Sequence, residues 1–338
     1  MDELRSRIET LLDEADVTGN RTLITRILLA GVQLGQDRTS RLDLKIASSA
    51  LSEMRDAFRL FAPYSDVPKV TVFGSARTRQ DDPLYLSARD VAAELARRGW
   101  MVVTGAGPGI MQAAAEGAGQ KMALGVSIRL PFEEKPNAVV AEDAHSVEMK
   151  YFFTRKLMLV KESSGFICLP GGFGTLDEMF ELLTLQQTGK AEPTPIVLLD
   201  APGGTFWRGL ERFIVDQLIP AGVISPDDFD RVLITDSAEQ AVARITGFWH
   251  NYDSLRWVDD VLVLRLKNAP TDAELEALNI EFAPFVASGL IERTDALPVE
   301  VNDRDRVELA RIALRLRQRE VGGLYRLIDA LNALASAD

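Results

Sequence analysis

Short runs of β-branched and other apolar residues alternate through the middle of the chain with stretches of helical periodicity. The apolar runs are KVTVFG, WMVVTG, ALGVSIRLP, GFICLP, PIVLLD and RVLITD. Between most of them lie helical stretches, among them DPLYLSARDVAAELARRG, EMKYFFTRKLMLVKES and TLDEMFELLTLQQTGK. Such alternation predicts a mostly parallel, doubly wound α/β sheet covered by helices on both faces. If the strands take the common order 3-2-1-4-5-6, the first and fourth are neighbours at the topological switch point.

The two ends of the chain carry different patterns. Residues 1–66 are charged and helix-periodic and end in a proline-containing linker, FAPYSDVPK, so we expect a helical N-terminal extension. Residues 67–252 hold the α/β pattern. Residues 253–338 predict a small α+β module: a strand in WVDDVLVLRL, a helix over TDAELEALNIEFAPFVASG, a strand in LIERTDALPVE and a long C-terminal helical stretch.

Composition excludes several classes of protein. The net charge of −12 disfavours binding to nucleic acid or to an anionic membrane, because those surfaces would repel the chain. No apolar run is long enough to span a membrane and the N-terminus lacks a signal-peptide core, so we expect a cytoplasmic protein. The single cysteine, Cys168, excludes an intrachain disulfide, and the two histidines lie far apart, which makes a metal site improbable.

Four of the predicted strands end in segments of unusual composition, GSAR, TGAGPGIMQAA, RLP and PGGFGT, and all but RLP contain glycine. The carboxyl ends of parallel strands meet at the edge where open α/β sheets bind ligands. Glycine lets backbone amides approach an anion, and the start of the following helix adds free N–H groups, so PGGFGT is a candidate phosphate cradle. Tight turns are the alternative reading of each loop. The candidate phosphate-binding residues are Gly74, Ser75, Arg77, Gly107, Gly109, Lys156, Gly171, Gly172, Gly174 and Thr175.

Neither standard nucleotide motif is present. GAGPGIM matches the dinucleotide fingerprint only loosely and follows the second strand, where that fingerprint normally follows the first. No glycine-lysine-serine or glycine-lysine-threonine sequence closes any of these loops. A kinase or a hydride-transfer enzyme is therefore disfavoured.

Two pairs of residues allow both a structural and a functional reading. Thr175 and Glu178 form a T-x-x-E pattern that predicts a capping box, yet a carboxylate beside a phosphate cradle is also placed to act on the ligand. Arg155 and Lys156 could grip phosphate oxygens or could be a solvated basic pair. The preceding aromatic residues Tyr151, Phe152 and Phe153 are more typical of a core than of base stacking.

PGGFGTLDE, with FFTRK shortly upstream and GSAR and GAGPGIM on earlier loops, resembles the LOG (Lonely Guy) family of cytokinin riboside 5′-monophosphate phosphoribohydrolases. The resemblance implies a Rossmann-like, usually dimeric hydrolase that splits a nucleoside 5′-monophosphate into free base and ribose 5-phosphate without a cofactor. It assigns Arg155 and Glu178 to the catalytic pair, and Gly171, Gly172, Gly174 and Thr175 to the phosphate loop.

This chain departs from the family pattern in ways that leave the base open. Phe152 and Phe153 stand where many short members have methionine and histidine, GAGPG replaces a glycine triplet, and Asp177 stands where many have glutamate. The substrate could be AMP, a cytokinin precursor or another nucleotide. The older family label, lysine decarboxylase, fits poorly because that chemistry needs pyridoxal phosphate on a lysine and an acidic partner for its ring nitrogen.

In the mechanism that fits these residues, Glu178 stabilises an oxocarbenium-like ribose and activates water while Arg155 holds phosphate or ribose. The rival interpretation is a carrier or sensor that binds a nucleotide or nucleotide-like cofactor without hydrolysis. The C-terminal stretch could serve homo-oligomer formation or effector binding.

Overall fold

The computed structural model describes residues 2–129, 137, 139–140, 145–229, 231–317 and 321–338. The chain divides into two compact units, residues 1–56 and residues 57–338. The first unit is helical, as predicted, with α1 (Asp2–Glu14), α2 (Arg21–Gln36) and the start of α3 (Arg41–Phe61), which ends in the second unit. Ile8 and Leu12 of α1 pack with Leu29 of α2. The predicted domain limits at residues 66 and 252 stay predictions.

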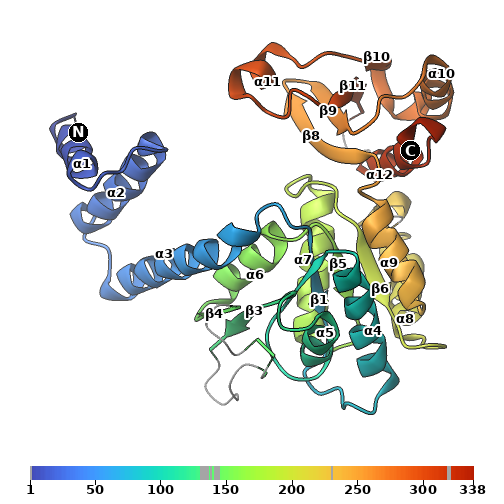
Figure 1. The fold of residues 1–338 in the computed structure, drawn as a ribbon, viewed down its shortest axis with the longest axis horizontal. Helices are drawn as coiled ribbons and strands as arrows, with labels where there is room; N and C mark the ends of the chain where they lie inside the picture. Colours follow the sequence, from blue (N-terminus) through green and yellow to red (C-terminus); the bar gives the residue numbers. More distant parts are fainter. Residues whose placement is uncertain (1, 130–136, 138, 141–144, 230, 318–320) are drawn as a thin grey trace. The chain divides into compact units, whose positions relative to one another are not determined.

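A seven-stranded parallel sheet forms the centre of the second unit (Figure 1). Its strand order, β4-β3-β2-β1-β5-β6-β7, contains the predicted order of six strands and adds β4 at one edge, which the sequence analysis placed partly in a helix. The strands are β1 (Lys69–Phe73), β2 (Met101–Thr104), β3 (Ala123–Ile128), β4 (Ser146–Met149), β5 (Phe166–Cys168), β6 (Ile196–Leu199) and β7 (Val232–Thr235). β1 pairs in parallel with both β2 and β5, so the switch point lies between β1 and β5.

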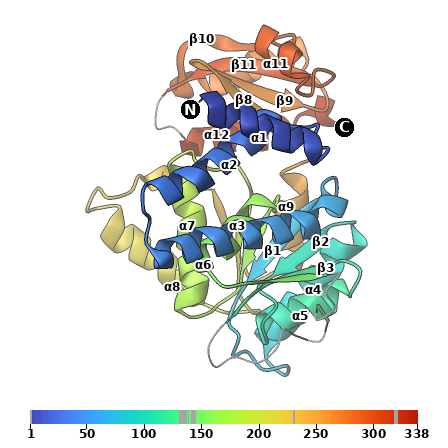
Figure 2. The same cartoon turned by 90° about the vertical axis from the view of Figure 1, so that its left-hand side faces the viewer.

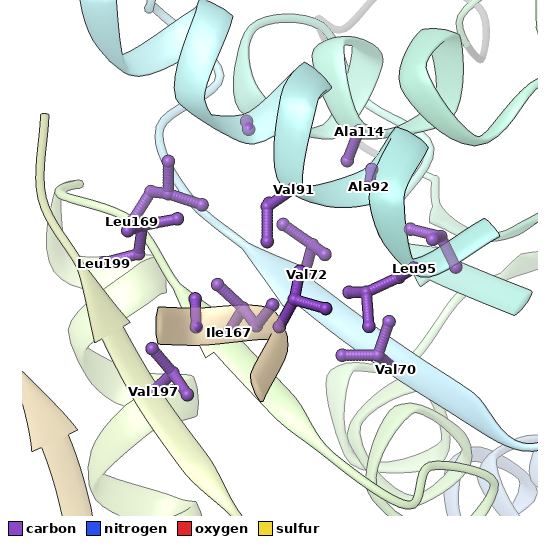
Figure 3. Packing of buried hydrophobic residues seen from close by; sticks show 14 of the residues in the cluster. Val70, Val72, Val91, Ala92, Leu95, Ala114, Ile167, Leu169, Val197 and Leu199 are labelled. Carbon is purple, nitrogen blue, oxygen red and sulfur yellow. The ribbon is translucent and has the colours of Figure 1, made fainter. Parts of the chain in front are cut away.

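Helices cover both faces of this sheet. They are α4 (Pro83–Arg97), α5 (Ile110–Ala118), α6 (Phe152–Lys161), α7 (Phe173–Gln187), α8 (Phe206–Phe213, continued by the π-helix Ile214–Leu218) and α9 (Ala238–Gly247). Val70 and Val72 of β1 and Ile167 of β5 pack against Val91 and Leu95 of α4 (Figure 3). α6 and α7 lie on the other side of the sheet from α4 and α5 (Figures 1 and 2). The doubly wound parallel prediction is confirmed.

Gly117 allows α4 and α5 to approach closely. A Cβ at this position would lie 2.0 Å from the backbone oxygen of Arg89 in α4. We expect Gly117→Ala to lower the free energy of unfolding by about 3 kcal/mol, the upper end of the usual range for overpacking, because backbone must move. Urea denaturation measures this change. The matched control is Gly209→Ala in α8, where an added Cβ meets no atom within 4 Å and helix propensity favours alanine. Equal stability of the two variants would contradict the account.

A four-stranded antiparallel sheet in the order β10-β11-β9-β8 lies beyond α9 in the sequence. Its elements are β8 (Tyr252–Val258), β9 (Val261–Leu266), α10 (Asp272–Glu281), β10 (Val286–Arg293), α11 (Pro298–Asp303), β11 (Ala310–Leu316) and α12 (Val321–Asn332). The remaining short turns of helix are Ala62–Tyr64, Pro226–Asp228, Ala283–Phe285 and Ala335–Ala337. The prediction of one long C-terminal helical stretch is therefore wrong in its first half. There ARIALRL forms a strand, with Ile312 and Leu314 buried. An apolar pattern this short fits both the period of a helix and the period of a strand.

Side chains tie α12 to the parallel sheet. The Thr194 N–H just before β6 donates to the Tyr325 hydroxyl at 3.0 Å, and Arg244 of α9 forms an ion pair with Asp329. The described residues include no helix with both the length and the apolar character needed to cross a bilayer.

Candidate functional site

A cavity of about 830 Å³ opens at the carboxyl ends of β1 and β5, where the sequence analysis placed the ligand. Nine of the predicted site residues line it: Gly74, Ser75, Arg77, Arg155, Gly171, Gly172, Gly174, Thr175 and Glu178. Gly107, Gly109 and Lys156 are not among its lining residues. Leu130 and Pro131 of the third loop lie outside the described residues. The loops after β1 and β5 and the helix α6 thus meet at one mouth.

The glycine loop after β5 leads directly into α7. The helix begins at Phe173 with Gly172 at its N-cap and no side-chain capping bond. The predicted capping box at Thr175 and Glu178 is therefore wrong, because the helix starts before Thr175. The start of α7 leaves backbone N–H groups beside the cavity, and these groups together with the helix dipole favour an anion. Gly171 must be glycine here, since a Cβ would lie 2.2 Å from the Thr175 hydroxyl oxygen.

Arg155 is held by carbonyl groups of β3 and of the loop after β2. Its Nε donates to the Val126 carbonyl at 2.9 Å, and its Nη2 donates to the Gly105 carbonyl at 3.4 Å. A Cβ on Gly105 would lie 2.0 Å from Nη2, so this glycine makes room for the guanidinium. The loop after β2 therefore positions Arg155.

Gly109 gives the same loop a second role. Its φ of +66° favours glycine, and a Cβ would lie 2.3 Å from the Ser75 carbonyl oxygen. The next residue, Ile110, donates its N–H to that same oxygen at 3.0 Å. The loop therefore braces the GSAR segment.

Glu178 is the buried carboxylate of the cavity. It is 7% exposed, and its Oε1 lies 4.0 Å from Nη1 of Arg155. Burial raises the pKa of Glu178 to about 7, opposed by the charges of Arg155 and Lys156 and assisted by Asp177 and Glu181. Burial, together with the Glu178 charge, raises the pKa of the buried Cys168 thiol, which favours a structural role over a nucleophilic one. Near neutral pH Glu178 can therefore both accept and return a proton.

Lys156 faces away from the phosphate loop toward the side of α7. Its Nζ lies 2.7 Å from carboxylate oxygens of both Asp177 and Glu181. Burial acts to lower the pKa of Lys156, but the hydrogen bonds from these two carboxylates hold it above its usual value. Asp177 and Glu181 stand on either side of Glu178 in sequence, so Lys156 neutralises the negative charge next to that carboxylate.

We expect Lys156→Met to move the pH dependence of activity. The change removes a positive charge near Glu178, and it also leaves the carboxylates of Asp177 and Glu181 without their partner. The lost cation and the two unpaired anions each raise the pKa of Glu178 above about 7. If Glu178 works in its ionised form, the rising limb of kcat/KM against pH moves to higher pH. Lys156→Arg keeps the charge and is the control that should retain the wild-type limb. If kcat/KM rises over the same pH range in the wild type and both variants, Lys156 has no electrostatic effect on Glu178.

Comparison with known proteins decides the family. A family model described as "Possible lysine decarboxylase" matches residues 109–245. A cytokinin riboside 5′-monophosphate phosphoribohydrolase from Mycobacterium tuberculosis is 32% identical over 178 residues, which are 51% of this chain and 90% of that protein. The chain belongs to the LOG family.

Two further comparisons have lower sequence identity. A LOG-family phosphoribohydrolase from Arabidopsis thaliana is 30% identical over 166 residues, covering 48% of this chain and 75% of that protein. Among solved structures, a molybdenum cofactor binding protein from Rippkaea orientalis is 23% identical, with a TM-score of 0.36 over 53% of this chain and 96% of that one.

The structure adds residues that the sequence analysis did not assign to the site. Phe152, Phe173 and Phe206 line the cavity with exposed fractions of 53%, 93% and 42%. Phe152 and its neighbour Phe153 were interpreted as core residues, which is wrong because both are exposed at the start of α6. Phe206 comes from α8 and carried no signal in the sequence. Gly105 belonged to a recognised loop, but only its contact with Arg155 shows what it does. In the part of the chain that the structure describes, no cluster of three or more metal-ligating side chains is found.

Proposed function

We propose that this chain hydrolyses the N-glycosidic bond of nucleoside 5′-monophosphates and releases the free base and ribose 5-phosphate. The observation that carries the proposal is Glu178, a buried carboxylate with a pKa of about 7, lying 4.0 Å from Arg155 in the cavity that also holds the glycine loop. A protein that only binds an anion gains nothing from a carboxylate in this place. The activity for which the LOG-family relatives are named points the same way.

In the proposed complex the 5′-phosphate binds the loop from Gly171 to Gly174. Backbone amides at the start of α7 donate to its oxygens, and the N-terminal end of the helix stabilises its charge. Arg77, which lines the same cavity, adds a positive charge at the loop after β1. Fixing the phosphate places the ribose across the cavity from the loop, so that binding energy holds C1′ near Glu178.

Glu178 then acts on the water that attacks C1′. The water oxygen bonds to C1′ as the bond from C1′ to the base nitrogen breaks, and the ribose passes through an oxocarbenium-like transition state. The Glu178 carboxylate takes the water proton and, with a pKa of about 7, returns it to the leaving base. Arg155 stabilises the carboxylate and hydrogen-bonds a ribose or phosphate oxygen. The account uses no metal and no cofactor.

We further propose that the working form is a cytoplasmic homo-oligomer. Support comes from apolar side chains exposed on the neighbouring helices α6 and α7, Phe153, Leu157 and Phe180, with exposed fractions of 55%, 47% and 40%. Exposed apolar side chains that cluster on a surface favour association. The base is left to experiment, because Phe152 and Phe206 offer aromatic surface that any base can contact.

Chromatography of AMP, CMP, GMP and isopentenyl-AMP after incubation with the protein tests the function and selects the base. Free base from at least one of them is the expected result. Tight binding without turnover of any of the four would instead indicate a carrier or sensor.

A further inference from the structure

A second cavity, of about 710 Å³, lies at the opposite ends of the catalytic strands. It is lined on one side by Lys69, Trp100 and Lys161 and on the other by Trp249, Lys267 and Arg306. Lys69 is the first residue of β1, and Lys161 ends α6. The cavity therefore lies where the parallel sheet meets the residues around β8 and β9.

Lys69 places a buried ammonium group at this cavity. The residue is 3% exposed, and its Nζ donates to the carbonyl groups of Tyr64 at 2.6 Å and Val67 at 3.0 Å. An ammonium has three N–H donors, so one donor is left over after these two bonds. Among the described residues no carboxylate lies within ion-pairing distance of this nitrogen. Burial lowers the pKa of Lys69, although the charges of Glu162 and Asp66 act to raise it.

Lys267, an exposed residue, also binds two backbone carbonyl groups at this cavity. Its Nζ donates to the carbonyl groups of Trp249 and His250, which again leaves one N–H donor. The other two cations at the cavity already have partners, Lys161 with Glu162 and Arg306 with Asp253. Asp66 is the third acidic residue of the lining. Basic groups thus outnumber acidic ones here, although the chain as a whole carries a net charge of −12.

We propose that this cavity binds the phosphate group of a small organic phosphomonoester, with the ammonium groups of Lys69 and Lys267 as its principal donors. Among the described residues neither ammonium group forms an ion pair, so a phosphate dianion would give both a direct partner through charge-assisted hydrogen bonds, which are strong. Trp100 and Trp249 add aromatic surface for the rest of the ligand. The volume accommodates a sugar phosphate or a mononucleotide, which share this chemistry.

The site would be connected to the catalytic cavity through rigid elements. β1 runs from Lys69 to the loop of Gly74, and α6 carries Arg155 near its start and ends at Lys161. The Ser164 N–H donates to the Lys69 carbonyl at 2.8 Å, which joins β1 to the segment leading into β5 and its glycine loop. A ligand bound between these elements and Lys267 would stabilise the full chain and bias the geometry of the catalytic loops.

The test is a titration of the full-length protein with inorganic phosphate, ribose 5-phosphate and AMP in turn, followed by calorimetry and by tryptophan fluorescence. Because phosphate also suits the catalytic loop, we expect two classes of binding in the wild type. Arg155→Met should weaken only the catalytic class. Lys267→Met, an exposed position, should weaken the other class by about tenfold or more, as one lost charge-assisted bond implies. Lys69→Met should do the same if circular dichroism shows it folded.

Lys121→Met, at an exposed lysine outside the cavity lining, is the matched control and should leave both classes unchanged. Sulfate at equal ionic strength separates phosphate recognition from general screening. The relative affinities for the three probes show whether sugar phosphate or nucleotide is preferred. A single binding class, or a Lys267→Met variant that titrates like the wild type, would overturn the proposal. Neither outcome bears on base release at Glu178.

Discussion

Glu178→Gln should lower kcat by about 10² to 10⁴, the usual contribution of one well-placed acid or base, while the protein stays folded. Glutamine keeps the size of the side chain but can neither accept a proton nor carry negative charge toward the oxocarbenium-like ribose. In the wild type we expect kcat/KM to rise with pH through about pH 7, because the pKa of Glu178 is about 7 and the ionised form is the base. The variant should lose this limb. Initial rates of base release across pH measure both effects.

A matched control is Glu239→Gln, which removes an exposed carboxylate from the first turn of α9. It should keep the wild-type rate and pH profile. Thermal unfolding of Glu178→Gln shows whether activity is lost only because the variant unfolds. We expect no loss of stability because a buried charge is removed. Unchanged turnover in the folded variant would reduce Glu178 to a structural residue.

Arg155→Lys should lower kcat/KM by roughly 10²-fold or more, on the scale of one lost positioned donor. Lysine keeps the charge but lacks the planar guanidinium group. It cannot donate to the carbonyl groups of Val126 and Gly105 and at the same time face Glu178. The ammonium would also leave unfilled the space that Gly105 provides for the guanidinium. Steady-state kinetics with the substrate selected by the nucleotide panel measures the loss.

Arg208→Lys on α8 is the control for an arginine-to-lysine change, because Arg208 is half exposed and does not line the cavity. Its guanidinium pairs with Glu211 in its own helix and donates to the Ile234 carbonyl at 3.4 Å. That variant should behave as the wild type. If Arg155→Lys retains full activity, catalysis requires only a positive charge at this position. The fixed geometry of the guanidinium group would then have no role.

The order of six parallel strands was predictable because they are short apolar runs, most of them separated by helical stretches, and because they take the common doubly wound order. β4 was missed since Ser146–Met149 is a partly exposed edge strand that lacks a continuous apolar run. The strand Ala310–Leu316 was missed for a different reason. Its alternating apolar and arginine residues also fit a helical period, and only pairing with β9 decides between the two.

Much of the site was also predictable, since glycine loops after parallel strands must meet at one edge of the sheet. The capping box was wrong because a threonine-to-glutamate spacing says nothing about where a glycine-rich loop starts its helix; the box is instead present at Thr271 and Glu274. The contacts of Lys156 with Asp177 and Glu181 and the approach of Phe206 depend on how helices pack. Sequence spacing alone does not contain that information.

The most direct test of the central claim is product analysis from AMP with the wild type and Glu178→Gln, using chromatography for the base and ³¹P NMR for the phosphorus product. Cleavage at C1′ gives adenine and ribose 5-phosphate in equal amounts, and we expect both from the wild type and almost none from the variant. If AMP proves not to be the accepted nucleotide, the best substrate of the panel replaces it. Release of adenosine with inorganic phosphate, or equal base release by both proteins, would contradict hydrolysis of the glycosidic bond by Glu178.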